Sequence, residues 1–252
     1  MKSDNFYIYG RNAVLEALES GQAMQKVYVM FGAQGGSVQK VFVKAKKNKI
    51  QCAFTDKKKF QELEKTVCGS PGKSQGVIAL INPFEIISTD EFIKKSFLIA
   101  PKPVAVILDG ISDPHNLGAI ARSAECSGAA GIILSERNSA PVTPAAVKVS
   151  AGALGHLFVA NAGNLIQAIG QLKAAGYWIV GADDSADKLY TAKIYDSPIA
   201  VIIGNEGKGI SPSLKKHCDF LVKIPLKGKV TSLNASVASG IILFEILRQR
   251  NQ

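Results

Sequence analysis

The sequence lacks long hydrophobic runs, and no apolar stretch reaches the roughly 18 residues that a membrane-spanning helix needs. The opening segment MKSDNFYIYG also lacks the apolar stretch of a secretory signal, so we expect a cytoplasmic protein with no membrane partner. Cysteine is scarce: the four cysteines stand far apart without a CxxC pair, and we expect reduced thiols. The three histidines do not join them at metal-ligand spacing, which argues against a zinc site.

Acidic residues are fewer than basic ones, and the excess of positive charge is spread unevenly along the chain. The formal net charge is +10. Residues 1–81 hold 13 Lys and Arg against 6 Asp and Glu, whereas residues 82–252 hold 17 against 14. Clusters such as KAKKNK and DKKK suit a polyanion, because Lys side chains near phosphates release condensed counterions. The first third therefore favours a nucleic-acid partner, although a solvated basic surface has the same composition.

Internal repeats are absent too, and the periodicity divides the chain into two parts. Over residues 1–81, helical patterns such as RNAVLEALES alternate with strand patterns such as KVYVM and QGVIALI. This alternation predicts a small three-layer α/β domain at 1–81, the part whose charge favours a nucleic-acid partner. The pattern then becomes irregular, and we place a linker at 82–102.

The second part, 103–252, restarts with short apolar runs typical of strands covered on both faces of a parallel sheet. The runs are VAVIL (104–108), GIIL (131–134), HLFVA (156–160), YWIVGA (177–182), IAVIIG (199–204) and FLVKIP (220–225). Helical segments are expected between them, including 117–127 and 163–175. The final NASVASGIILFEILRQR is apolar nearly all round, so we expect it to be largely buried, with a partner subunit as one candidate for covering it.

Three polar loops follow strands of the predicted sheet, and ligands bind at such carboxyl ends. The loop GNEGKGIS (204–211) is not a Walker A motif, since Lys208 precedes Gly209 instead of Ser or Thr. It is not a dinucleotide fingerprint either, because its glycines follow the order G-x-x-G-x-G late in the chain. Two interpretations stay open: a close approach of backbone to a ligand around Glu206, or a tight turn with positive φ at its glycines.

The other two loops combine small polar residues with one arginine. LDGISDPHNLGAIARSAE places Asn116 where it suits a helix N-cap, and Arg122 among small neighbours that let it approach a phosphate or carboxylate. A surface salt bridge is the alternative for Arg122. IPLKGKVTSLNASVASG holds Ser232, Asn234 and Ser236 within five residues, more small polar groups than one helix start needs.

Taken together and in this order, the three loops resemble the three motifs of the SpoU (TrmH-like) family of RNA 2′-O-ribose methyltransferases, in the SPOUT superfamily. NLGAIAR matches the first motif, IIGNEGKGI the second and IPLKGKVTSLNASVA the third. The match covers 104–250. The front third, with YGRNAVLEAL and SQGVIAL, resembles the substrate-binding domain of the family's ribosomal-RNA and transfer-RNA branch. Bacterial 23S rRNA guanosine 2′-O-methyltransferases are the most similar branch.

The resemblance implies an α/β catalytic domain whose parallel sheet ends in a C-terminal trefoil knot, which periodicity does not reveal. It implies S-adenosylmethionine (SAM) as the cofactor, contacted by Gly204, Ile224 and Leu233 through backbone groups and an apolar floor. On this interpretation, the second loop needs glycines because a side chain would intrude on the cofactor. The family is homodimeric and uses the final helix at the interface, which agrees with the apolar 237–247 stretch.

The implied reaction moves a methyl group from a sulfonium to a ribose 2′-oxygen and needs no metal. Positioning supplies much of the catalysis, and the hydroxyl must lose its proton as it attacks. Arg122, reaching the site across the dimer, is expected to orient the hydroxyl and stabilise the developing alkoxide, since arginine is a poor base. The general base stays open, with an RNA phosphate or water taking the proton.

The other implied catalytic residues support this arrangement. Asn116 would hold the substrate or Arg122, and Glu206 would fix Arg122 or the third loop through charge-assisted hydrogen bonds. Ser232 and Asn234 would shape the pocket for cofactor and ribose.

The expected substrate is a guanosine ribose in ribosomal RNA, with transfer RNA as the alternative and no DNA. A non-catalytic RNA-binding protein would leave the Arg-bearing site unexplained. A base methyltransferase of the same superfamily would lack the first and third motifs, and a Rossmann-type enzyme would carry its Gly-rich loop after an early strand. Two positions depart from the family pattern: Asn205, where relatives often carry a small residue, and Ser74, where some carry His and where RNA choice could change.

Overall fold

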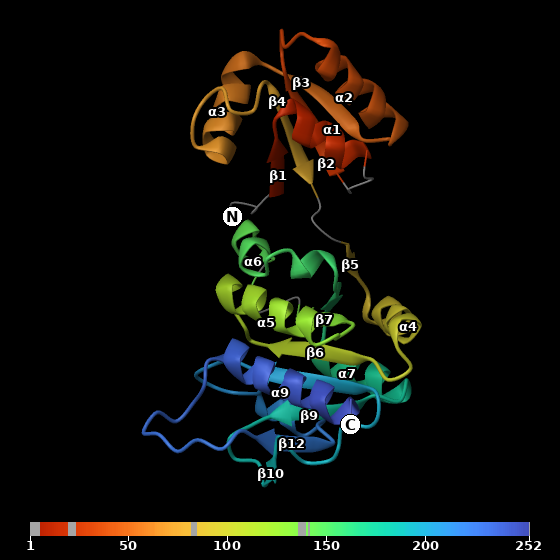
Figure 1. Ribbon diagram of the computed structural model, residues 1–252, viewed down its shortest axis with the longest axis vertical. Coiled ribbons are helices and arrows are strands. Elements are labelled where there is room, and N and C mark those ends of the chain that lie inside the picture. The colour runs from red at the N-terminus through yellow and green to blue at the C-terminus, as the bar shows by residue number, and fades with distance from the viewer. Residues whose placement is uncertain (1–5, 20–23, 82–84, 136–139, 141, 252) are drawn as a thin grey trace. The chain divides into compact units, whose positions relative to one another are not determined.

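The computed structural model describes residues 6–19, 24–81, 85–135, 140 and 142–251. The chain divides into two compact units, 1–84 and 85–252 (Figure 1). Within the described ranges, no helix is both long and apolar enough to cross a membrane. The four cysteines are all free thiols.

The first unit is a four-stranded sheet with helices on both faces. Its elements are β1 (Phe6–Tyr9), α1 (Arg11–Glu19), β2 (Met24–Met30), α2 (Gly36–Lys47), β3 (Gln51–Thr55), α3 (Lys57–Cys68) and β4 (Val77–Ile81). The strand order is β1-β4-β2-β3, with β4 antiparallel to both of its neighbours and β2 parallel to β3. Val27 and Val29 alternate along β2 and pack with Val14 of α1 and Val41 of α2. Helix α3 lies on the other side of the sheet (Figure 1), as a three-layer domain requires.

The second unit is an eight-stranded sheet in which every pairing is parallel. Its elements are β5 (Ile86–Ile87), α4 (Thr89–Ile99), β6 (Val104–Asp109), α5 (Pro114–Cys126), β7 (Gly131–Ser135), α6 (Pro144–Val149), the 3₁₀ turn η1 (Ala153–Gly155), β8 (Phe158–Ala162), α7 (Leu165–Ala174), β9 (Trp178–Ala182), β10 (Lys188–Leu189), β11 (Ile199–Gly204), α8 (Pro212–Lys215), β12 (Phe220–Lys223) and α9 (Ala235–Arg250). The strand order is β10-β12-β9-β11-β6-β7-β8-β5. The predicted α/β class with a parallel sheet is confirmed.

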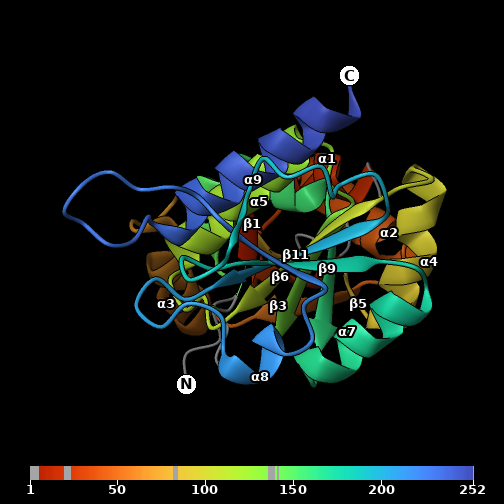
Figure 2. The same cartoon turned by 90° about the horizontal axis from the view of Figure 1, so that it is seen from below.

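Helices cover both faces of this sheet. Figure 2 shows α5 and α9 along one face and α7 and α8 along the other. The continuous apolar strands predicted from the sequence are buried, because both faces of the sheet are covered. The central strands β6 and β11 pair in register from Val104 beside Ile199 to Asp109 beside Gly204. This register places the loops after the two strands next to each other.

Two local predictions need correction. The linker placed at 82–102 contains β5 and α4, which pack against β8 of the second unit; residues 82–84 lie outside the described part of the chain. The helix expected at 117–127 begins at Pro114, and its N-cap is Asp113, whose carboxylate accepts from the His115 N–H at 2.9 Å. Proline suits the first helical position, so Asp113-Pro114 starts the helix and leaves the Asn116 side chain available.

The close packing of β7 predicts a difference between two glycine substitutions. A Cβ at Gly131 would overlap the backbone of Phe158 on β8, whereas a Cβ at Gly170, in exposed helix α7, would meet open space. We expect Gly131→Ala to lower the free energy of unfolding by about 2–4 kcal/mol. Gly170→Ala should raise it by about 0.5–1 kcal/mol. Urea unfolding of the two variants beside the wild type measures both values, and equal shifts would contradict the packing of β7 on β8.

Candidate functional site

The loops after β6 and β11 are tied together by hydrogen bonds. The Asn205 side chain donates to the Gly110 carbonyl at 3.0 Å, and the Ser211 N–H donates to the Asp109 carboxylate at 2.6 Å. The Asn205 oxygen also accepts from the Gly207 N–H at 2.9 Å, which turns the chain back on itself. Asn205, noted above only as a departure from the family pattern, therefore holds the first two predicted loops in one arrangement.

The glycine that opens the second loop is needed for the loop's own closure. A Cβ at Gly204 would overlap the backbone of Gly209 and Ile210, where the loop returns to pair Asn205 with Gly209. Gly209 has a φ of +64°, which favours glycine. Closure of the loop therefore gives a reason for glycine at both positions, and the expectation that a cofactor also approaches Gly204 stays a prediction.

Three of the predicted catalytic residues form a chain of hydrogen bonds. The Asn116 amide donates to the Glu206 carboxylate, and the Asn234 amide donates to the Asn116 oxygen at 2.9 Å. Asn234 is also the N-cap of α9, accepting from the Ser236 N–H at 2.9 Å. One residue from each predicted loop takes part, so the loops converge on a common polar centre.

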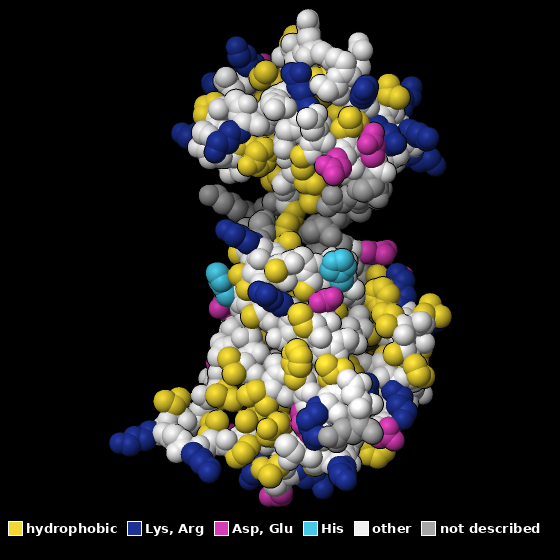
Figure 3. Space-filling view, in the orientation of Figure 1, with side chains coloured by type: hydrophobic (Ala, Val, Ile, Leu, Met, Phe, Trp, Pro, Cys, Tyr) yellow, Lys and Arg dark blue, Asp and Glu magenta, His cyan; other side chains and the backbone are white. Residues whose placement is uncertain are grey.

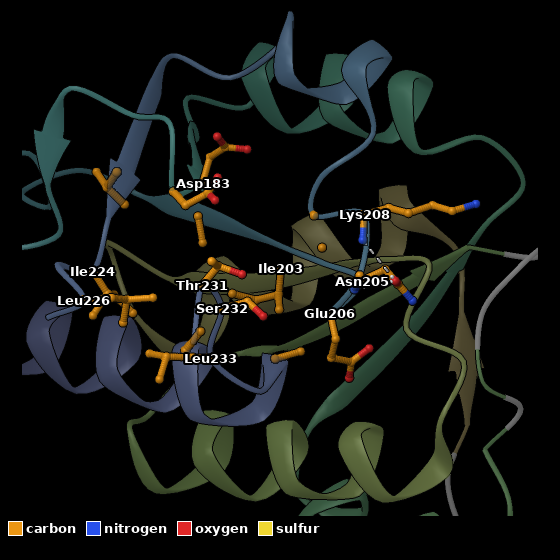
Figure 4. Close-up of a pocket in the computed structure, with 18 of the residues that line it drawn as sticks. Asp183, Ile203, Asn205, Glu206, Lys208, Ile224, Leu226, Thr231, Ser232 and Leu233 are labelled. Carbon is orange, nitrogen blue, oxygen red and sulfur yellow. Dashed lines mark hydrogen bonds between the residues drawn. The ribbon is translucent and has the colours of Figure 1, made fainter. Parts of the chain in front are cut away.

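A cavity of about 300 Å³ opens beside this centre, at the carboxyl ends of β9, β11 and β12. Five of the predicted site residues line it: Gly204, Glu206, Ile224, Ser232 and Leu233. Figure 4 shows Ile224, Leu226 and Leu233 gathered to one side of the cluster, with Asp183 and Glu206 apart from them at different ends. Three carboxylates line the cavity, those of Asp183, Asp184 and Glu206, together with Lys208 and Lys215. An apolar wall with carboxylates beside it suits a small molecule with an apolar portion and a cationic group.

Asn116 and Asn234 belong to the hydrogen-bonded centre and do not themselves line the cavity. Arg122 is the predicted residue that belongs to neither. It lies on α5, six residues beyond Asn116, and is exposed. Among the described residues it has no hydrogen-bond or ion-pair partner, and it does not line the cavity. Glu206 accepts from Asn116, so within this chain it does not hold Arg122, which was one of the two roles expected of it.

The sequence analysis missed a buried ion pair on the far wall of the cavity. Asp183 follows β9 and pairs with Lys215 of α8; its side chain is 2 % exposed. Burial alone would raise the pKa of Asp183, but the hydrogen bonds from Lys215 and Ser185 outweigh it and hold that pKa below its usual value. The segment GADD ends a parallel strand, so the strand-end argument used for the other loops would have found it.

Two family models together cover almost the whole chain. The model of the SpoU rRNA methylase family matches residues 103–244. A model described as RNA 2′-O ribose methyltransferase substrate binding matches residues 7–87. The chain belongs to the SpoU methylase family.

Relatives and solved structures agree with this membership of the SpoU family. A Bacillus subtilis (strain 168) protein named as a TrmH family tRNA/rRNA methyltransferase is 38% identical over 251 residues, which span 100% of this chain and 98% of the relative. The SpoU methyltransferase AviRb from Streptomyces viridochromogenes, crystallised with AdoMet, is 25% identical, with a TM-score of 0.68 over 98% of this chain and 91% of that one. An rRNA methyltransferase from Sinorhizobium meliloti has a TM-score of 0.72 at 25% identity, covering 98% of this chain and 88% of that one.

The ion pair between Asp183 and Lys215 predicts that the stability of the fold depends on pH. Removing the charge in Asp183→Asn leaves Lys215 without its partner and should lower the free energy of unfolding by about 1–3 kcal/mol at pH 7. Because the folded-state pKa of Asp183 is depressed, its contribution is present above the unfolded pKa of about 3.9 and is lost as the pH falls through the folded value. The denaturant midpoints of wild type and variant should therefore approach each other as the pH falls below about 4.

Asp187→Asn is the matched control, since Asp187 is exposed in the same loop and does not line the cavity. It should unfold like the wild type at every pH. A pH-independent effect of Asp183→Asn would show that the ion pair does not stabilise the fold.

Proposed function

We propose that the protein transfers a methyl group from SAM to a ribose 2′-hydroxyl of RNA, with a guanosine of 23S ribosomal RNA as the substrate. The observation that carries this proposal is the convergence of all three loops on one chain of hydrogen bonds, Asn234 to Asn116 to Glu206, beside a cavity that the second and third loops line. A binding module has no need of such a centre. Transfer RNA is the second candidate, because the relatives are named for both RNAs.

The cavity has the chemistry to hold SAM. Ile224, Leu226 and Leu233 supply apolar surface, while the carboxylates of Glu206 and Asp184 line the same cavity and attract a cation. When bound, SAM supplies an electrophilic methyl group on a positively charged sulfur. The trefoil knot that the family resemblance implies is proposed together with this cofactor site.

The hydrogen-bonded centre prepares this chain's residues for a ribose. Glu206 orients the Asn116 amide, and the Asn116 oxygen receives the Asn234 amide, so each side chain is held before substrate arrives. Ser232 lines the cavity next to these residues and offers a hydroxyl. Arg122 orients the 2′-hydroxyl and stabilises its developing charge, while an RNA phosphate or water accepts the proton.

The placement of Arg122 supports a homodimer in which this residue completes the partner's site. Val237 and Phe244, seven residues apart on α9, are about half exposed and form an apolar stripe. Gly240 lies on the same helix, and a Cβ there would come within 3.5 Å of Ser123, the residue after Arg122. A subunit that covers the α9 stripe would therefore meet Arg122.

The RNA is expected to bind the first unit, which carries the charge imbalance of the chain. Lys and Arg side chains are spread over the face of this unit seen in Figure 3, with few Asp and Glu between them. Such a surface attracts RNA phosphates by counterion release.

Methyl transfer to unmodified bacterial RNA tests the proposal. With labelled SAM, the wild type should produce a labelled 2′-O-methylnucleoside from ribosomal RNA and not from transfer RNA. Arg122→Ala should lower the rate by about 100-fold or more, because it removes the charge that stabilises the transition state. Its affinity for SAM should be unchanged, since Arg122 does not line the cavity. Label on a base, or no label despite RNA binding, would contradict the proposal.

Mixing two inactive variants tests the dimer. Leu233→Arg places a cation in the cavity wall and should abolish SAM binding, whereas Arg122→Ala keeps the cavity intact. If Arg122 acts on the partner's site, an equal mixture should recover about a quarter of the wild-type activity, because half of the dimers are heterodimers with one complete site. If Arg122 acts within its own chain, the mixture stays inactive.

A further inference from the structure

A second cavity lies in the first unit, and no predicted site residue belongs to it. Its volume is about 410 Å³. It lies between the start of α1, the loop after β2, the first turns of α3 and the loop between α3 and β4. Six of its lining residues matter for the argument: Arg11, Gln34, Lys57, Glu64, Gly72 and Gln75.

A buried carboxylate holds the loop between α3 and β4 in shape. Glu64 of α3 is 4 % exposed and accepts from the Ser74 N–H at 2.9 Å and from the Ser74 hydroxyl. Burial would raise the pKa of Glu64, but the hydrogen bonds from Ser74 and the Gly72 N–H prevail and lower it. Ser74 is fully buried, so this position shapes the loop and does not itself touch RNA.

The same loop carries backbone strain at an exposed residue. Gln75 has a φ of +53°, which is uncommon outside glycine and costs about 1 kcal/mol or more. Its carbonyl accepts from the Arg11 Nε at 2.9 Å. Gly35 lies close to the same guanidinium, since a Cβ there would come within 3.2 Å of its Nη1. The Arg11 side chain is therefore held through its Nε by the Gln75 carbonyl, while its terminal nitrogens have no acceptor among the described residues.

The lining has the chemistry of a nucleotide site. Arg11 and Lys57 are cations, and the one carboxylate, Glu64, already accepts hydrogen bonds from the loop. Gln34 and Gln75 present side-chain amides, which can pair with the donors and acceptors on the edge of a nucleobase. The Gln75 side-chain oxygen accepts from the Arg11 backbone N–H at 3.4 Å, so its NH₂ group is the part that can donate to a base. RNA is read by proteins at unpaired nucleotides, whose bases can leave the stack and enter such a pocket.

We propose that this cavity binds one unpaired nucleotide of the RNA substrate, with the base between Gln34 and Gln75 and the phosphate at Arg11 and Lys57. The site selects RNA by the presence of an unpaired nucleotide, whereas the surrounding lysines attract any RNA. The inference rests on the proposed function for the identity of RNA as the substrate.

Binding of hairpin RNA by the full-length protein tests the proposal without methyl transfer. The probes are a labelled hairpin with one unpaired nucleotide in its stem, varied among the four bases, and the same hairpin fully paired. Fluorescence anisotropy at physiological salt should show at least about fivefold tighter binding of the hairpin with the unpaired nucleotide, the lower end of what stacking and hydrogen bonds to one base contribute. Equal affinity for the two hairpins would overturn the proposal.

Lys57→Gln and Lys58→Gln form a matched pair. Both lysines are exposed in the first turn of α3 and both substitutions remove one charge, but only Lys57 lines the cavity. Lys57→Gln should weaken binding of the hairpin with the unpaired nucleotide about five- to tenfold, as expected for loss of one charge-assisted contact. Lys58→Gln should change it less than about twofold, as expected for a diffuse surface charge. Equal losses would show that charge alone binds the RNA.

Gln75→Gly separates binding from folding. Glycine accepts the positive φ, so the melting temperature should stay the same or rise, while the preference for the unpaired nucleotide should disappear with the amide. Retained preference would overturn the role of Gln75.

Competition with free nucleoside monophosphates distinguishes the source of the ligand. Displacement of the hairpin only at high nucleotide concentration supports an RNA site, and tight binding of a monophosphate without competition by RNA overturns it. These binding measurements contain no SAM. A negative result would overturn the nucleotide site and not the methyl-transfer proposal, and a failure of methyl transfer would not affect the binding result.

Discussion

The parallel, in-register pairing of β6 with β11 is the constraint on which the catalytic unit depends. It sets Asp109 beside Gly204 and so brings together two loops that are 95 residues apart in the chain. Asn205 and Ser211 then bond back to the β6 loop, and β9 and β12 bring their own strand ends to the same edge. The cavity is a consequence of strand order, since the strand ends of a parallel sheet share one edge.

Partly or fully buried carboxylates hold the functional loops in both units. Glu64 fixes the loop beside the cavity of the first unit, and Asp183 fixes the segment after β9 through Lys215 and Ser185. Both carboxyl groups have pKa values below their usual range, because the hydrogen bonds outweigh the cost of burial. A carboxylate that accepts several hydrogen bonds gives a loop one geometry, which a binding site needs before its ligand arrives.

The parallel sheet and the three site loops could be predicted because they follow from local patterns: buried runs, strand ends and motif spacing. Asp183 was missed because its loop has no glycine pattern, although the strand-end rule applied. The structural need for glycine at 204 was not predicted, because its close neighbour is the backbone five residues later, which spacing does not show. Helix α4 was taken for linker, and its capping by Ser88 was overlooked. The proposed role of Arg122 in a partner's site concerns a second subunit, which one chain's sequence does not place.

The central claim is that the cavity at the ends of β9, β11 and β12 is the SAM site. Backbone amide chemical shifts of the isotope-labelled protein, recorded with and without SAM, test it most directly. The account predicts that the largest changes fall on Gly204, Ile224, Leu233 and the residues beside Asp183, with the first unit undisturbed. Changes confined to residues outside this cavity, or none at saturating SAM, would contradict the account.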